Sequence, residues 1–222
     1  MSDRFSYNHF MSKFKILFFI SLLFVSISSA SAEPYADKEL LKRIEKKYKI
    51  FAKKRFFFQQ KTLDKLKDAS DFEKLDGVNK FYNDVRYSSD KKTYGMSDYW
   101  ATPYEFLGRD RGDCEDYVIA KYFALKYLGM DMKKLFFFYV KSTKFTAAHM
   151  VLAYYETPSA MPLILDNNNF KVLPANKRKD LKPIYRLQAG QIEKISTGKK
   201  VKSEKVGRKW DQLIKNIQRK KI

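Results

Sequence analysis

Apolar residues at helical spacing dominate the first half of the chain. Between Tyr35 and Leu66 they recur every three or four positions while lysine and arginine fill the other faces, which is typical of an amphipathic helix. The residues of this apolar stripe are Leu40, Leu41, Ile44, Tyr48 and Phe51. A second helix is predicted further on, with a stripe formed by Val78, Phe81, Tyr82 and Val85.

The most strongly patterned helix begins near Cys114. Its apolar face is formed by Tyr117, Ala120, Phe123, Ala124, Tyr127 and Leu128. Asp113 is suited to cap its start, because an aspartate accepts hydrogen bonds from the first free N–H groups. Gly129 is suited to end it, because glycine tolerates a left-handed backbone. The pattern therefore places Cys114 in the first turn of a helix.

Strand-like runs follow this helix. Leu135–Val140 and Ala148–Tyr155 are continuous and apolar, Leu163–Leu165 leads into a turn at Asp166–Asn169, and Ile184–Leu187 is suited to close a sheet. Helices that precede a run of strands indicate an α+β fold in which the helices pack on an antiparallel sheet.

The N-terminus has the pattern of a targeting segment. Lys13 and Lys15 precede an apolar run, Ile16–Ile27, and small residues follow at Ser28–Ala32. This order predicts a signal peptide over residues 1–32, cut after Ala32, and export of the rest of the chain. The apolar run is about 12 residues long, whereas a membrane span needs about 20. An uncleaved anchor is the alternative.

Composition narrows the class of protein. The chain has 222 residues, and a hydrophobic content of 45% excludes a wholly disordered protein. A single cysteine excludes an intramolecular disulfide framework and any multi-cysteine metal centre. The formal net charge is +20, and it becomes +18 without residues 1–32, which carry three basic residues and one acidic residue. The exported chain then keeps one cysteine, Cys114, and one histidine, His149.

The basic residues concentrate toward the C-terminus. Residues 191–222 hold 11 lysines and arginines against three acids, which indicates a folded domain over 33–190 followed by a basic tail. The tail contains a short amphipathic helix marked by Val206, Trp210, Leu213, Ile214 and Ile217. We expect this helix to pack on the core with its lysines solvated. Attraction to a membrane surface is the alternative.

Three residues have the chemistry of a thiol enzyme. Cys114 at a helix start would have its thiolate favoured by the free N–H groups and the helix dipole. His149 near the start of a strand is suited to exchange the thiol proton, and Asp166 at the end of the next strand is suited to orient the imidazole. A buried structural cysteine and a structural histidine are the alternative.

Acidic residues surround the cysteine. Asp110, Asp113, Glu115 and Asp116 lie within seven residues, and their charge would raise the pKa of the thiol. Capping of the helix start explains such acids without any ligand. A hard cation such as Ca²⁺, bound by their oxygens, would offset the charge beside a thiolate.

Four segments around these residues resemble the bacterial transglutaminase-like cysteine proteinases. They are the signature segment Asp98–Gly108, the nucleophile helix Gly112–Tyr122, the histidine strand Ala148–Tyr155 and the aspartate strand Leu165–Asn167. The resemblance extends from about Leu40 to Leu187, which is nearly all of the expected exported chain.

The resemblance implies a periplasmic, Ca²⁺-dependent endopeptidase with Cys114, His149 and Asp166 as its catalytic triad. It places calcium at Asp113 and Glu115, and Asp116 also matches the motif. Such proteases cleave the N-terminal region of a large repeat adhesin beside a pair of alanines and so release biofilm cells. They are held inactive by the periplasmic domain of an inner-membrane cyclic di-GMP receptor.

Two other functions remain open at this point. Amide hydrolysis or acyl transfer on cell-wall peptides would use the same triad. A non-enzymatic module could instead bind anionic envelope polymers or membrane headgroups through its basic residues. Export disfavours nucleic acid as a partner.

Overall fold

Residues 33–144, 146, 148–188 and 190–222 are described by the computed structural model, and the expected signal peptide lies outside them. Residues 33–222 form one compact unit. Within the described residues, no helix combines the length and apolar content needed to cross a membrane.

The helices occupy the N-terminal half and the C-terminal end. They are α1 (Lys38–Leu66), α2 (Asp71–Asn83), α3 (Asp90–Tyr94), α4 (Pro103–Arg109), α5 (Cys114–Tyr127) and α6 (Glu204–Gln218). The three helices expected from the apolar periodicity before Gly129 are therefore confirmed. The long first helix is interrupted at Lys49, where φ is 71° and ψ is 180°. The periodicity did not indicate this break, because the apolar stripe continues through it.

Seven strands form one antiparallel sheet in the order β6-β5-β4-β3-β7-β8-β9. They are β3 (Leu135–Ser142), β4 (Ala148–Tyr154), β5 (Leu163–Asp166), β6 (Asn169–Pro174), β7 (Leu181–Gln188), β8 (Gln191–Lys194) and β9 (Lys199–Val201). A separate parallel pair joins β1 (Arg86–Tyr87) to β2 (Arg111–Gly112). The α+β prediction is confirmed.

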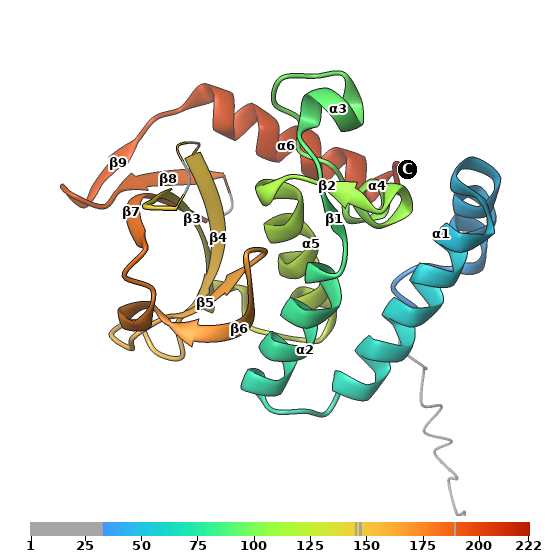
Figure 1. The fold of residues 1–222 in the computed structure, drawn as a ribbon, viewed down its shortest axis with the longest axis horizontal. Coiled ribbons are helices and arrows are strands. Elements are labelled where there is room, and N and C mark those ends of the chain that lie inside the picture. The colour runs from blue at the N-terminus through green and yellow to red at the C-terminus, as the bar shows by residue number, and fades with distance from the viewer. Residues whose placement is uncertain (1–32, 145, 147, 189) are drawn as a thin grey trace, which may run out of the picture. The chain divides into compact units, whose positions relative to one another are not determined.

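Helices α5 and α2 lie on one side of the sheet (Figure 1). Helix α5 packs against β4, and α2 packs against α5, β5 and β6. A large apolar core lies between them, and a second buried cluster contains Phe138, Val140, Val151, Ala153 and Ile164. Alternate residues of β3 and β4 therefore enter different clusters. This burial of both faces explains why the two strands are continuous apolar runs rather than alternating ones.

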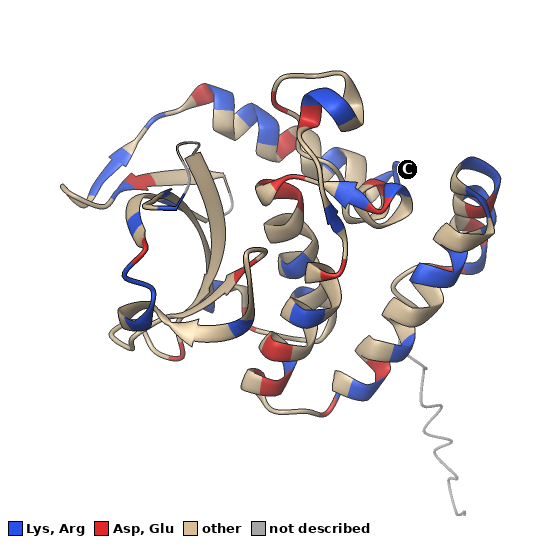
Figure 2. Cartoon of the chain, in the orientation of Figure 1, with Lys and Arg blue, Asp and Glu red and all other residues tan. Residues whose placement is uncertain are grey.

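The C-terminal residues join the same structure. Strand β8 pairs with β7, so the boundary expected at residue 190 falls between two strands that hydrogen-bond to each other. The predicted amphipathic helix is confirmed as α6. Its Leu213 is 1% exposed, and the ring of Trp210 lies 5.8 Å from that of Phe137. Many lysines and arginines of this segment are exposed. Figure 2 marks their positions along the chain in blue.

Candidate active site

His149 and Asp166 meet because β4 and β5 are neighbours in the sheet. His149 is the second residue of β4 and Asp166 is the last residue of β5. The imidazole Nε2 lies 2.8 Å from Asp166 Oδ1. Both residues are buried, at 6% and 1% exposed. The structure thus joins two of the three expected triad residues by a hydrogen bond.

The Asp166 carboxylate accepts hydrogen bonds on both oxygens. The main-chain N–H of Asn168 donates to Oδ1 at 2.9 Å, and Arg178 Nη2 donates to Oδ2 at 2.6 Å. Burial alone would raise the pKa of Asp166, but the contacts with His149, Asn168 and Arg178 outweigh it and hold that pKa well below its usual range. The acid that faces His149 is therefore a carboxylate rather than a carboxylic acid.

Arg178 is a buried site residue that sequence reasoning missed. Its guanidinium bridges Asp166 and Asp180, with a contact of 2.9 Å to Asp180 Oδ2. It is 7% exposed. Nothing in the sequence distinguishes it from neighbouring bases such as Lys177 and Lys179. Only the fold shows that this one basic side chain turns inward.

Cys114 occupies the first position of α5, as predicted, with Asp113 at the N-cap position. Its Sγ lies 3.0 Å from Glu115 Oε2, and the side chain is 9% exposed. Burial and then the Glu115 carboxylate raise the pKa of the thiol, while a hydrogen bond from the main chain of Met150 lowers it. Met150 directly follows His149 in β4, the strand against which α5 packs. The position at the helix start predicted a thiolate. In the structure the thiol form is favoured instead, because burial and the acidic neighbours raise the pKa more than the helix start lowers it.

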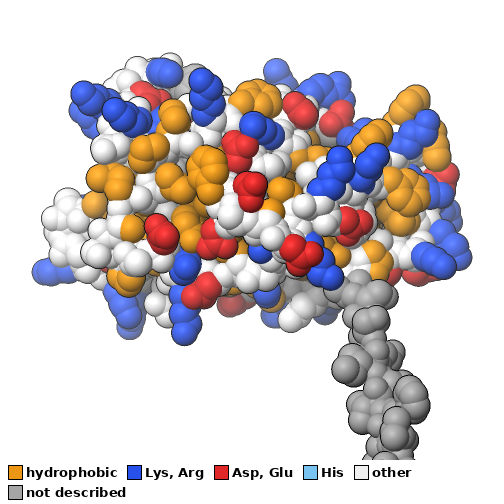
Figure 3. Space-filling view, turned by 90° about the horizontal axis from the view of Figure 1, so that it is seen from below, with side chains coloured by type: hydrophobic (Ala, Val, Ile, Leu, Met, Phe, Trp, Pro, Cys, Tyr) orange, Lys and Arg blue, Asp and Glu red, His pale blue; other side chains and the backbone are white. Residues whose placement is uncertain are grey.

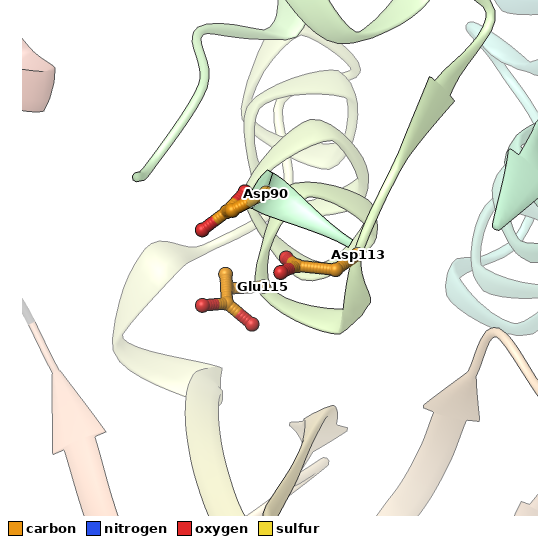
Figure 4. Close-up of side chains that lie close together, drawn as sticks. All are labelled: Asp90, Asp113 and Glu115. Atoms are coloured by element: carbon orange, nitrogen blue, oxygen red, sulfur yellow. The ribbon is translucent and has the colours of Figure 1, made fainter. Parts of the chain in front are cut away.

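Asp113 and Glu115 are grouped with an acid from another helix, Asp90 of α3. Carboxylate oxygens of the three residues lie within 4.8 Å of one another (Figure 4). Asp90 Oδ1 and Asp113 Oδ1 are buried and accept no hydrogen bond from the described residues. Burial, followed by the charges of the neighbouring acids, raises the pKa of Asp113 to about 10. Like charges held together in a partly buried position, with unsatisfied oxygens, fit a hard divalent cation such as Ca²⁺.

The other acids near Cys114 have structural partners. Asp116 is completely buried, and its carboxylate accepts from the main-chain N–H of Ala101 at 2.9 Å and of Asp113 at 3.4 Å. The structure therefore does not bring Asp116 into the three-carboxylate group. Asp110 pairs with Arg86 at 3.4 Å. Asp90 was missed, because it lies 23 residues before Asp113 in a short helix without any local motif.

The arrangement of these residues defines a class of enzyme. A cysteine at a helix start, a histidine on the strand packed against that helix and an aspartate on the next strand form the site of transglutaminase-like and papain-like thiol enzymes. Residues 51–184 match the family described as bacterial transglutaminase-like cysteine proteinase BTLCP. The chain belongs to this family and is a cysteine protease.

Solved structures support the same assignment. Calcium-bound LapG of Legionella pneumophila has a TM-score of 0.69 and 37% identity, covering 81% of this chain and 98% of that chain. EGTA-treated LapG of the same organism has a TM-score of 0.71 and 36% identity, covering 83% and 100%. No curated protein matched.

Proposed function

We propose that the protein is a periplasmic, calcium-dependent cysteine endopeptidase that cleaves the N-terminal region of a large surface adhesin and so controls biofilm attachment. The observation that carries the chemistry is the His149–Asp166 hydrogen bond beside the Cys114 helix. Family membership favours proteolysis over acyl transfer on cell-wall peptides, which would use the same residues. The signal-peptide pattern of residues 1–32 supports export.

In this mechanism Asp166 is hydrogen-bonded to Nε2 of His149, so Nδ1 is the ring nitrogen that exchanges the proton of Cys114. His149 accepts the thiol proton as Cys114 Sγ attacks the scissile carbonyl, and it then donates that proton to the departing amine. Water hydrolyses the resulting thioester. The ionised Asp166 stabilises the imidazolium formed on the way, and the main-chain N–H of Cys114 is suited to bind the oxyanion.

Calcium is the cofactor we assign to Asp90, Asp113 and Glu115. Their oxygens provide the ligand chemistry, and two of these oxygens have no other partner among the described residues. The calcium-bound and EGTA-treated forms of Legionella pneumophila LapG support this assignment. Bound Ca²⁺ supplies positive charge that offsets the carboxylates beside the thiol.

The regulator we propose is the periplasmic domain of an inner-membrane receptor for cyclic di-GMP, and nucleic acid is not a partner. A purely basic binding module is less well supported. On the face seen in Figure 3, lysine and arginine side chains are interspersed with acidic and apolar ones rather than gathered in one patch. A module that held anionic polymers would also have no use for the buried His149–Asp166 pair.

The test is cleavage of a recombinant adhesin N-terminal fragment that contains an alanine pair. Cys114→Ala and His149→Ala should each abolish cleavage, because residues 33–222 hold no second thiol or imidazole. Asp166→Asn should retain roughly 10- to 100-fold more activity than Cys114→Ala, because an amide can still orient the ring. Circular dichroism checks that each variant folds.

A fragment whose alanine pair is replaced by two arginines is the matched substrate control. Full cleavage by folded Cys114→Ala would contradict the thiol mechanism. Equal cleavage of both fragments would contradict the substrate assignment while leaving the protease assignment intact.

A further inference from the structure

Helix α5 carries a lysine that is completely buried. Lys121 lies seven residues after Cys114 and is 0% exposed. A lysine is almost never fully buried unless its ammonium group has partners. The mechanism described above does not use Lys121, so its burial needs another explanation.

The partners of Lys121 are two asparagines of α2. Nζ donates to Asn79 Oδ1 at 2.8 Å and to Asn83 Oδ1 at 2.7 Å. Nζ also lies 5.8 Å from the centroid of the Tyr117 ring. A lysine ammonium donates hydrogen bonds and accepts none, so it holds both amides with their oxygens toward it. Their NH₂ groups must therefore point away from Lys121.

Those NH₂ groups are directed at the turn between β5 and β6. Asn83 Nδ2 donates to the main-chain oxygen of Asp166 at 2.8 Å and of Asn169 at 3.0 Å. Asn79 Nδ2 donates to the main-chain oxygens of Asn169, at 3.0 Å, and Phe170, at 3.2 Å. Two steps of hydrogen bonding thus join Lys121 to the backbone of Asp166.

The same turn holds the side chain of Asp166 in place. Asp166 Oδ1 accepts from the main chain of Asn168 and meets His149 Nε2, while Asn168 Nδ2 lies 3.4 Å from that ring nitrogen. A displacement of the turn would therefore move the carboxylate and the imidazole together.

We propose that Lys121 is a positioning residue, which orients Asn79 and Asn83 so that they clamp the β5–β6 turn and fix Asp166 against His149. This inference rests on the proposed triad. Burial lowers the pKa of Lys121 to about 7, with an opposing effect from Asp166. A neutral amine still has two N–H groups, so both asparagine oxygens keep a donor in either protonation state.

Two isosteric variants separate this clamp from simple packing. Asn83→Asp keeps an acceptor for Lys121 but loses the donor to the Asp166 carbonyl. Asn79→Asp adds the same charge beside the same lysine but leaves the Asn83–Asp166 contact intact. On the adhesin fragment, we expect kcat to fall about 10- to 100-fold in Asn83→Asp, with KM changed less than about threefold, and to fall much less in Asn79→Asp.

Substitution of the lysine gives a second, independent comparison. Lys121→Met removes the donor that orients both amides, and Lys126→Met is the matched control on the exposed side of the same helix. We expect Lys121→Met to lower kcat as Asn83→Asp does and Lys126→Met to leave it unchanged. If Lys121→Met does not fold, Asn83→Asp still tests the clamp.

A substrate-free readout distinguishes failure of this inference from failure of the proposed function. In the full chain with His9→Gln, His149 supplies the only imidazole, and its ¹⁵N shifts report which ring nitrogen carries the proton. We expect a single Nε2–H tautomer in this parent and a mixture in Asn83→Asp. An unchanged tautomer in Asn83→Asp, or an unchanged kcat in folded Lys121→Met, would overturn the positioning role of Lys121.

Discussion

At the scale of single residues, the ionisation of Asp166 depends on groups from several parts of the chain. Burial by itself would favour the neutral acid and so weaken its ability to stabilise an imidazolium. His149 and then the main-chain N–H of Asn168 oppose this effect, and Arg178 adds a charge-assisted hydrogen bond of 2.6 Å. Asp180 in turn holds the guanidinium. The buried charges therefore form a connected set in which each one has a partner.

We predict that Arg178→Met moves the acid limb of the pH–rate profile to higher pH. Without the guanidinium the pKa of Asp166 rises. As the pH is lowered, the carboxylate is therefore protonated, and activity is lost, at a higher pH than in the wild type. The lowered native pKa of Asp166 also stabilises the fold above its unfolded pKa, and this contribution is lost as the pH falls through the native value. Removing the one arginine that pairs with this buried carboxylate should cost about 3 kcal/mol in unfolding free energy near pH 7.

Asp180→Asn is the control for Arg178→Met. It neutralises the half-buried second partner of Arg178 and keeps the Arg178–Asp166 contact, so the acid limb should move far less. The measurements are cleavage rates from pH 4 to 9 and urea unfolding at pH 7. Equal profiles for the wild type and Arg178→Met would show that Arg178 does not control the charge of Asp166.

The sequence contained enough to identify the residues with distinctive chemistry but not those that support them. Cys114 and His149 are unique within residues 33–222, and both fall in motifs that resemble a known family. Arg178 and Lys121 belong to abundant residue types, and their roles depend on which side of an element turns inward. Asp90 joins its partners only because α3 packs beside the start of α5.

At the scale of elements, the start of α5 is fixed by close contacts with the preceding strand. A Cβ at Gly112 of β2 would lie 2.4 Å from Asp116 Oδ2 and 2.6 Å from a ring carbon of Phe106. Asp116 cannot move away without losing its contact with Ala101, and Phe106 is 0% exposed. The absence of a side chain at residue 112 therefore allows the turn that presents Cys114.

We predict that Gly112→Ala destabilises the protein by about 1–3 kcal/mol and lowers kcat, because overpacking shifts the first turn of α5. Gly207→Ala is the matched control, since a Cβ at that position in α6 meets nothing within 4 Å. It should instead stabilise the protein by about 0.5–1 kcal/mol through helix propensity. Urea unfolding followed by circular dichroism, together with the cleavage assay, tests both. A neutral Gly112→Ala would show that the start of α5 tolerates displacement.

Elements with an apolar periodicity could be predicted from the sequence, and elements held mainly by main-chain pairing could not. Helices α1, α2 and α5 and the strands β3, β4, β5 and β7 follow this rule. The short strands β8 and β9 did not stand out, because they are largely polar and β9 is exposed along its whole length. Strand β6 was not predicted either. Its first residue, Asn169, was expected in the preceding turn, and the next two residues, Phe170 and Lys171, are exposed.

At the scale of the whole molecule, charge is distributed unevenly between the surface and the site. The chain is strongly basic, yet three carboxylates converge beside Cys114. Burial and mutual repulsion raise the pKa of Asp113 to about 10, and burial raises that of Asp90. A protein without calcium must therefore keep protons on this group or accept the repulsion among its charges.

We predict that thermal stability in EGTA falls as the pH rises from 5 to 9. The unfolded chain loses the Asp113 proton at about pH 4, whereas burial and the neighbouring acids hold the pKa of Asp113 well above that value in the folded chain. Protonated Asp113 therefore contributes its whole stabilisation below the pKa that it has in the unfolded chain. This contribution is lost as the pH rises toward the pKa that it has in the folded chain. Saturating Ca²⁺ should remove this fall, because the cation binds the ionised carboxylates. Each 1 kcal/mol lost should lower Tm by roughly 2–4 °C in a chain of this size.

Cleavage assays test whether the same carboxylates and their calcium ion also control catalysis. EGTA should inactivate the wild type, Ca²⁺ should restore cleavage, and Mg²⁺ should restore it poorly because it requires tighter octahedral geometry and retains its waters. Asp113→Ala and Glu115→Ala should reproduce the chelated state, and Asp113→Asn should flatten the dependence of Tm on pH in EGTA. If these acids only capped the helix, their removal would ease formation of the thiolate, and activity would stay level or rise. Full activity in EGTA, with no heat of Ca²⁺ binding by calorimetry, would return Asp113 and Glu115 to that capping role.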